Sequence, residues 1–255
     1  MSKILAVVNQ KGGVGKTTTT VNVCAILAKK GKKVLLIDSD PQGNATSGVG
    51  VDKNQEKSIY DVLVNDVEIE EAIVESSVKN LFVCPSNINL AGAEVELVSV
   101  MSREQRLKEK LEAVSDKFDY ILIDCPPSLG LITINAFTAA DSLLIPIQCE
   151  YYALEGVGQL MNTVNIIKKQ LNKSLYIEGV ILTMNDARTN LSNQVIEEVK
   201  AFFKDNVYKT IIPRNVKLSE APSYGMPISE YAPLSKGAKY YEKLTKEIMK
   251  GRVSK

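Results

Sequence analysis

The sequence predicts a doubly wound α/β fold, with a mostly parallel sheet and helices on both faces. Along the 255 residues, short apolar, β-branched runs alternate with longer segments of helical periodicity. Runs such as 34–37 and 120–123 are apolar throughout, which is typical of strands buried on both faces. Repeated alternation of strand and helix joins parallel strands through crossover helices, and this produces the doubly wound class.

The apolar runs place strands at 3–8, 33–38, 81–84, 119–123, 142–147, 176–183 and 207–212. Helical patterns fall at 16–30, 58–64, 103–115, 130–140, 153–171, 191–204 and 236–250. No repeat or low-complexity linker interrupts them, so we expect one domain over residues 1–255. No run approaches about 18 uncharged apolar residues, so no transmembrane helix is expected. The strand pattern at the N-terminus also argues against a signal peptide.

The composition excludes several kinds of active site. The chain contains no histidine, which removes Ser-His-Asp triads, Cys-His dyads and histidine-ligated zinc. Its four cysteines stand among apolar residues without Cys-x-x-Cys spacing, which predicts buried, reduced thiols in a cytoplasmic protein: Cys24, Cys84, Cys125 and Cys149. Chemistry is therefore left to carboxylates, lysines, backbone amides and a metal ion.

Residues 11–18, Lys-Gly-Gly-Val-Gly-Lys-Thr-Thr, predict a phosphate-binding loop, since they follow an apolar strand pattern and open a helix. Glycines allow backbone N–H groups to turn toward phosphate, and a helix N-terminus adds positive potential. Lys16 can reach the β- and γ-phosphates, and the Thr17 hydroxyl can bind Mg²⁺. The expected nucleotide contacts are Lys11, Gly12, Gly13, Val14, Gly15, Lys16, Thr17 and Thr18. An exposed turn is the alternative, and it fits this context poorly.

Acidic residues follow two other predicted strands. Asp38 and Asp40 lie in Asp-Ser-Asp-Pro-Gln-Gly-Asn, and Asp124 ends the run Tyr-Ile-Leu-Ile-Asp. Either motif alone could be a surface turn or a common strand end. Because ligands of open α/β sheets bind beyond the carboxyl ends of strands, we interpret all three as metal-proximal or water-orienting groups. Asp124 would act on Mg²⁺ directly or through water.

These motifs resemble the ParA/MinD group of ATPases. The standard phosphate loop has glycine where Gln10 stands, whereas the group's deviant Walker A box has the early lysine found here as Lys11. The resemblance implies that Lys11 reaches the nucleotide of a dimer partner, Asp40 positions the attacking water and Asp38 acts near the Mg²⁺ shell. Further ParA-like blocks, at 148–156 and 211–222, extend the resemblance over nearly the whole chain. The resemblance implies adenine contacts by Pro213 and Asn215 of the second block, and by Met184, which follows the strand predicted at 176–183.

Charge is unevenly distributed. Residues 1–150 contain 15 Lys and Arg against 20 Asp and Glu, whereas residues 151–255 contain 16 against 10. A basic half can face nucleic acid or an acidic membrane surface, although the charge alone favours an ordinary solvated surface. The resemblance to chromosomal ParA proteins, also called Soj, implies DNA contacts by Arg188 and Lys217. Lysine stands at 217 where arginine is common, which puts a bidentate phosphate contact in doubt.

The leading prediction is a cytoplasmic, nucleoid-associated partitioning ATPase that uses ATP and Mg²⁺. By the resemblance, an ATP-bound homodimer binds double-stranded DNA without sequence preference. Hydrolysis stimulated by a ParB/Spo0J-type partner then releases it. A rival is a MinD-like, membrane-associated regulator, which would need an amphipathic C-terminal membrane helix. Here the tail's narrow stripe of Tyr240 or Tyr241, Leu244 and Ile248 favours docking on the core. A metal-cluster scaffold lacks clustered cysteines, and intact Lys11 and Asp40 disfavour a non-hydrolysing DNA-binding module.

Overall fold

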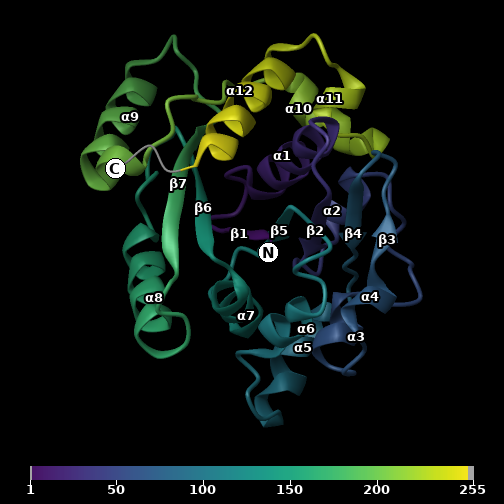
Figure 1. Cartoon of the computed structure of the whole chain (residues 1–255). Coiled ribbons are helices and arrows are strands. Elements are labelled where there is room, and N and C mark those ends of the chain that lie inside the picture. Colours follow the sequence, from purple (N-terminus) through teal and green to yellow (C-terminus); the bar gives the residue numbers. More distant parts are fainter. Residues whose placement is uncertain (1, 252–255) are drawn as a thin grey trace.

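The computed structural model describes residues 2–251 and contains one seven-stranded sheet, in the order β3-β4-β2-β5-β1-β6-β7 (Figure 1). All neighbouring strands are parallel except β3, which pairs antiparallel with β4. The strands are β1 (Lys3–Val7), β2 (Val34–Asp38), β3 (Val74–Glu75), β4 (Leu81–Cys84), β5 (Tyr120–Asp124), β6 (Ser142–Gln148) and β7 (Tyr176–Thr183). The predicted doubly wound class is confirmed.

Helices cover both faces of the sheet (Figure 1). One face carries α1 (Lys16–Lys29), α2 (Asn44–Gly48), α10 (Val216–Glu220), α11 (Ile228–Tyr231) and α12 (Lys236–Lys250). The other carries α3 (Ile59–Leu63), α4 (Ile69–Ala72), α5 (Leu90–Glu96), α6 (Arg106–Glu112), α7 (Leu131–Ala139), α8 (Val157–Gln170) and α9 (Asn190–Phe203). Short 3₁₀ turns occupy 97–99, 204–206 and 221–224.

Alternation along the strands explains why both faces are covered. On β1, Leu5 and Val7 enter the core under α1 and α12, whereas Ala6 packs into the core under α7 and α8. All three side chains are fully buried. Burial on both faces is what makes these strands apolar at every position.

The predicted strand at 207–212 is wrong. The segment runs beside β7 with only isolated bridges, Val180 to Val207 and Asn185 to Pro213. Tyr208 N and Ile212 N donate to β7 carbonyls at 3.0 and 2.8 Å, but Thr210 N donates to the Glu247 carboxylate at 3.1 Å. The Glu247 side chain of α12 therefore accepts the hydrogen bond from Thr210 N that β7 would accept in a regular strand. Strand β3 and the short helices α2, α4, α5, α10 and α11 were not predicted.

The prediction that the cysteines are buried and unpaired is confirmed for all four thiols. Tyr241, Leu244 and Ile248 of α12 are also buried, at 1%, 0% and 0% exposure, so the C-terminal stripe packs on the core as predicted. Within residues 2–251, no helix has the length and apolar character needed to cross a membrane.

Candidate functional site

The phosphate-binding loop leaves the carboxyl end of β1 and enters α1. Gly13 and Gly15 adopt left-handed backbone conformations, with φ of 74° and 91°. Residues with a Cβ atom rarely adopt this geometry, which explains the glycines at both positions. The Lys16 ammonium donates to the Lys11 carbonyl at 3.1 Å, which places it inside the loop. Burial lowers the pKa of Lys16, while the charge of Asp124 opposes that shift.

Val14 and Lys11 take different positions in this loop. Val14 is buried, and its carbonyl accepts from Thr183 Oγ1 at 2.8 Å, which fixes the loop against the end of β7. Lys11 is half-buried, and its backbone N–H donates to Asn9 Oδ1 at 3.0 Å. Gly12 and Gly13 are exposed. The loop therefore has one buried side and one open side.

Asp124 lies directly beneath the first turn of α1. Its carboxylate accepts hydrogen bonds from Thr17 Oγ1 at 2.7 Å and from Thr20 Oγ1 at 2.9 Å. Burial and the negative charge of Asp38 raise the pKa of Asp124 to about 7. The fold therefore brings two of the three expected metal-proximal groups, Thr17 and Asp124, into direct contact.

Asp38 neighbours Asp124 through the register of β2 and β5, but its oxygens are already engaged. Oδ2 accepts from both Thr46 N and Thr46 Oγ1 at 2.8 Å, and Oδ1 accepts from Asp40 N at 3.2 Å. Burial raises the pKa of Asp38 to about 6, against the lowering effect of these hydrogen bonds. In this arrangement Asp38 orders the turn that carries Asp40.

The oxygen groups around Asp124 fit Mg²⁺, which takes oxygen ligands and usually retains waters and phosphate oxygens. Two buried carboxylates with raised pKa values also form a site that a cation stabilises. Over residues 2–251, no group of three or more His, Cys, Asp or Glu side chains could ligate a metal. A cation here would accordingly depend on Thr17, Asp124, waters and the nucleotide.

The open side of the loop borders a cavity of about 260 Å³. Asp40 lines it together with Lys16 and Thr17, and Asp40 also accepts from Gln42 N at 2.9 Å through Oδ1. The remaining lining residues come from the loop, α2 and the ends of β5 and β7: Gly12, Gly13, Gly15, Thr18, Asn44, Pro127 and Met184. We call this space the phosphate cavity.

A second cavity, of about 350 Å³, adjoins the first and is here called the base cavity. Met184, Pro213 and Asn215 line it, so the structure gathers all three expected adenine contacts. Met184 has a left-handed φ of 52° at the end of β7. Asn215 Oδ1 accepts from Lys217 N at 2.9 Å and so caps α10. The other walls include Thr18 of α1 and Tyr241 of α12.

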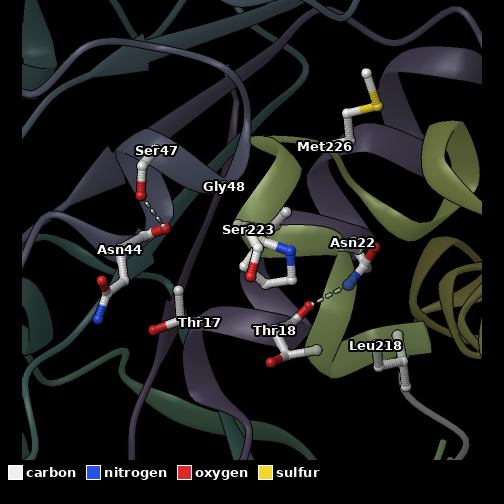
Figure 2. Close-up of a pocket in the computed structure, with 12 residues that line it drawn as sticks. Thr17, Thr18, Asn22, Asn44, Ser47, Gly48, Leu218, Ser223 and Met226 are labelled. Carbon is white, nitrogen blue, oxygen red and sulfur yellow. Dashed lines mark hydrogen bonds between the residues drawn. The ribbon is translucent and has the colours of Figure 1, made fainter. Parts of the chain in front are cut away.

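A third cavity, of about 410 Å³, extends between α1, α2 and the 221–224 turn (Figure 2). Thr18, Asn44, Ser47 and Ser223 surround it with hydroxyl and amide groups, and Met226 adds an apolar wall. Thr18 lines all three cavities. The phosphate and base cavities are thus connected at the first turn of α1.

The two expected DNA contacts lie on the surface, each beside a carboxylate. Arg188 has a side chain that is 88% exposed and forms a bidentate pair with Asp186, at 2.9 and 2.7 Å. The guanidinium holds the pKa of Asp186 at about 2. Lys217, 52% exposed, pairs with Glu220 at 2.8 Å. Exposed pairs of this kind are weak, so both cations can exchange partners.

Comparison with known proteins identifies the family. A family model described as an AAA domain matches residues 2–177. The sporulation initiation inhibitor protein Soj of Bacillus subtilis (strain 168) is 63% identical over 249 residues, covering 97% of this chain and 98% of that protein. The chain belongs to the ParA/Soj family. The chromosome-partitioning ATPase Soj of Treponema pallidum (strain Nichols) is 51% identical over 98% of each chain.

Solved structures of the same fold contain nucleotide. A Mycobacterium smegmatis protein described as cobyrinic acid a,c-diamide synthase, with bound ATP analogue and magnesium, has a TM-score of 0.86 and 37% identity. The match covers 98% of this chain and 95% of that one. This neighbour contains an ATP analogue and magnesium, which supports ATP and Mg²⁺ as the cofactors expected from the sequence. The family and the P-loop fold support nucleotide hydrolysis.

Several residues of the site were not expected from the sequence. Asn185 directly follows Met184, a residue that lines the base cavity, and its Oδ1 is buried without a hydrogen-bond partner within residues 2–251. Its neighbour Met184 was expected, but an asparagine in a polar loop gives no signal of its own. Thr46 was also not expected, because its contacts with Asp38 and Ser86 form only in the fold. Tyr241 was expected to pack on the core, but its place in the base cavity was not expected.

Proposed function

We propose that this chain is a single-domain, Mg²⁺-dependent partitioning ATPase whose ATP-bound dimer binds DNA. The observation that carries the proposal is the 2.7 Å hydrogen bond from Thr17 to the buried Asp124, since Thr17 also lines one cavity together with Lys16 and Asp40. In the proposed roles, this arrangement would bring together a phosphate-binding cation, two metal-proximal oxygens and a water-orienting carboxylate. Phosphoryl transfer requires positioning and charge stabilisation of this kind.

Each residue then has a defined task. Lys16 binds the β- and γ-phosphates, and N–H groups of residues 12–18 complete the cradle. Thr17 and Asp124 would hold Mg²⁺, which neutralises charge on the phosphates when bound. Asp40 accepts a hydrogen bond from the attacking water and orients it. Asp38 keeps Asp40 in place through the Asp40 N–H.

Adenine recognition is supported by the chemistry of the base cavity. Met184 and Pro213 offer apolar contact surface, and Asn185 Oδ1 is a buried acceptor without a partner in the described chain. The exocyclic amine of adenine can satisfy that acceptor, whereas the carbonyl of guanine cannot. The ribose would pass Thr18, where the cavities meet.

Dimer formation is proposed through Lys11. Lys16 already occupies the interior of the loop, whereas Lys11 starts it on the outer side. We propose that Lys11 contacts the phosphates of a partner subunit's nucleotide. Two basic C-terminal halves would then face DNA together, with Arg188 and Lys217 contacting its phosphates. A ParB/Spo0J-type protein would stimulate hydrolysis and thereby release the dimer from the nucleoid.

The MinD-like alternative receives less support. It requires a C-terminal apolar face that is available to lipid, but Leu244 and Ile248 are fully buried under α1 and the sheet. Exposing them would cost the burial energy of two large aliphatic side chains, about 1.5–3 kcal/mol each. The partitioning function therefore fits α12 better.

The test measures dimerisation by light scattering and DNA binding by gel retardation, with a slowly hydrolysed ATP analogue. We expect ATP-dependent DNA binding that weakens roughly a thousandfold between ~50 and ~200 mM salt. Lys11→Ala should bind nucleotide yet remain monomeric. Arg188→Glu should dimerise yet lose DNA binding, while Lys217→Glu should weaken it less. The matched control Lys168→Glu makes the same charge change on α8 and should bind DNA normally. DNA binding without ATP, or full DNA affinity in Arg188→Glu, would refute the proposal.

A further inference from the structure

Helix α12 contacts three separate walls of the base cavity, although only one of its residues lines that cavity. Gly237, Tyr241 and Glu247 make these contacts from successive turns of the helix. α12 lies along α1 and beside α10 (Figure 1). The three contacts join parts of the chain that are far apart in sequence.

The first contact fixes the wall after β7. Glu247 accepts from Lys209 N at 2.9 Å and from Thr210 N at 3.1 Å, and Thr210 Oγ1 donates to the same carboxylate. Three residues later Pro213 enters the base cavity. In an ordinary strand at this place, the Thr210 N–H would donate to β7, but here it donates to Glu247. Glu247 thereby determines where the chain leaves the edge of the sheet.

The second contact fixes the wall formed by α1. The Tyr241 ring lines the base cavity, and its hydroxyl lies 3.1 Å from Thr19 Oγ1 in a hydrogen bond. Both residues are buried. Because Thr19 N donates to Gly15 O at 2.9 Å, this bond connects α12 to the part of the phosphate loop that enters α1.

The third contact fixes the wall formed by α10. A Cβ atom on Gly237 would lie 2.9 Å from Leu218 Cγ, so glycine allows α10 to approach α12 closely. Leu218 lines the base cavity. The close approach thus determines how far Leu218 and Asn215 stand from the opposite wall.

We propose that α12 is the positioning element of the base cavity and sets the preference for adenine over guanine. The inference rests on the proposed adenine site. Glu247 keeps residues 209–213 at one distance from β7, and Tyr241 and Gly237 keep α1 and α10 at fixed distances from it. Asn185 follows the cavity-lining Met184, and its buried Oδ1 is without a partner in the described chain. With the walls fixed, the adenine amine would reach this acceptor, whereas guanine would leave it unpaired. A loosened wall would let both bases bind without that contact.

The experiment compares dissociation constants for ATP and GTP by calorimetry in the full chain. We expect Glu247→Ala to weaken ATP binding about tenfold and GTP binding less than about twofold, so that selectivity falls. Tyr241→Phe keeps the ring and should lose about threefold in selectivity. The matched control Glu242→Ala removes an exposed carboxylate of α12 that pairs only with lysines among the described contacts, and it should retain wild-type selectivity.

The outcomes separate this inference from the function on which it rests. If wild-type protein binds ATP and GTP equally, the adenine site itself is wrong. If wild type prefers ATP and Glu247→Ala keeps the same ratio while its melting temperature falls, α12 contributes stability alone and the inference is overturned. Should Glu247→Ala fail to fold, Glu247→Gln and Tyr241→Phe decide the matter, and unchanged selectivity in both contradicts it.

Discussion

The phosphate cavity and the base cavity are built in different ways. Most of the phosphate cavity comes from segments that directly follow β1, β2 and β5, three adjacent parallel strands. The base cavity instead combines the end of β7, the segment 212–222 and Tyr241, and α12 joins them. The first consists mainly of turns at the ends of adjacent strands, which the sheet brings together, whereas the second depends on side-chain contacts from α12. We therefore expect variants of the first to change catalysis and variants of the second to change selectivity.

Asp40→Ala should have the largest effect. Loss of the group that orients water should lower turnover on the order of a hundredfold or more, while ATP affinity stays within about threefold. Turnover and calorimetry on the same preparation give both numbers. ATP-dependent dimers should form and persist. Normal turnover, or loss of the dimer, would assign Asp40 another role.

Lys16→Ala tests the phosphate contact itself. Because a cation that binds phosphate acts in both ground and transition states, ATP affinity and turnover should fall together, on the order of a hundredfold. Affinity is read by calorimetry with ATP and with GTP, and both should fall alike. An unchanged ATP affinity would contradict the place given to Lys16.

Asn185→Ala tests the proposed adenine contact at the base cavity. Removing the buried acceptor should lower ATP affinity about tenfold and leave GTP affinity nearly unchanged. Turnover at saturating ATP should remain near wild type, because the phosphate cavity is intact. A loss of turnover without loss of affinity would show that the two cavities are not separable.

The smallest effect concerns pH. In metal-free protein, the raised pKa values of Asp38 and Asp124, about 6 and about 7, mean that the folded state binds protons more tightly than the unfolded chain. Stability should accordingly fall as pH rises from about 4 to about 7. Melting temperatures at pH 5 and pH 8 measure this, and the difference should shrink with Mg²⁺ and ADP and in Asp38→Asn. A higher melting temperature at pH 8 than at pH 5 in metal-free protein would contradict this prediction.

The same contrast explains what the sequence could predict. The phosphate loop and the acidic strand ends are contiguous motifs, and the strand pattern alone places them at one edge of the sheet. The role of Glu247 has no local signature, because its partners at 209 and 210 lie 38 and 37 residues earlier. For that reason the apolar run at 207–212 indicated a strand, although its backbone is partly bonded to α12. Asn185 likewise acquires its environment only when residues 212–214 lie against it, and Thr46 acquires its contact with Ser86 only in the folded chain.

The most direct test of this division compares kcat and KM for ATP and GTP with wild-type protein and duplex DNA. If the phosphate cavity performs the chemistry and the base cavity only selects, the two nucleotides should differ in KM, by about tenfold. Their kcat values should then agree within about twofold, as expected for a binding interaction that does not change in the transition state. Equal KM values with unequal kcat values, or no hydrolysis of ATP, would contradict the account.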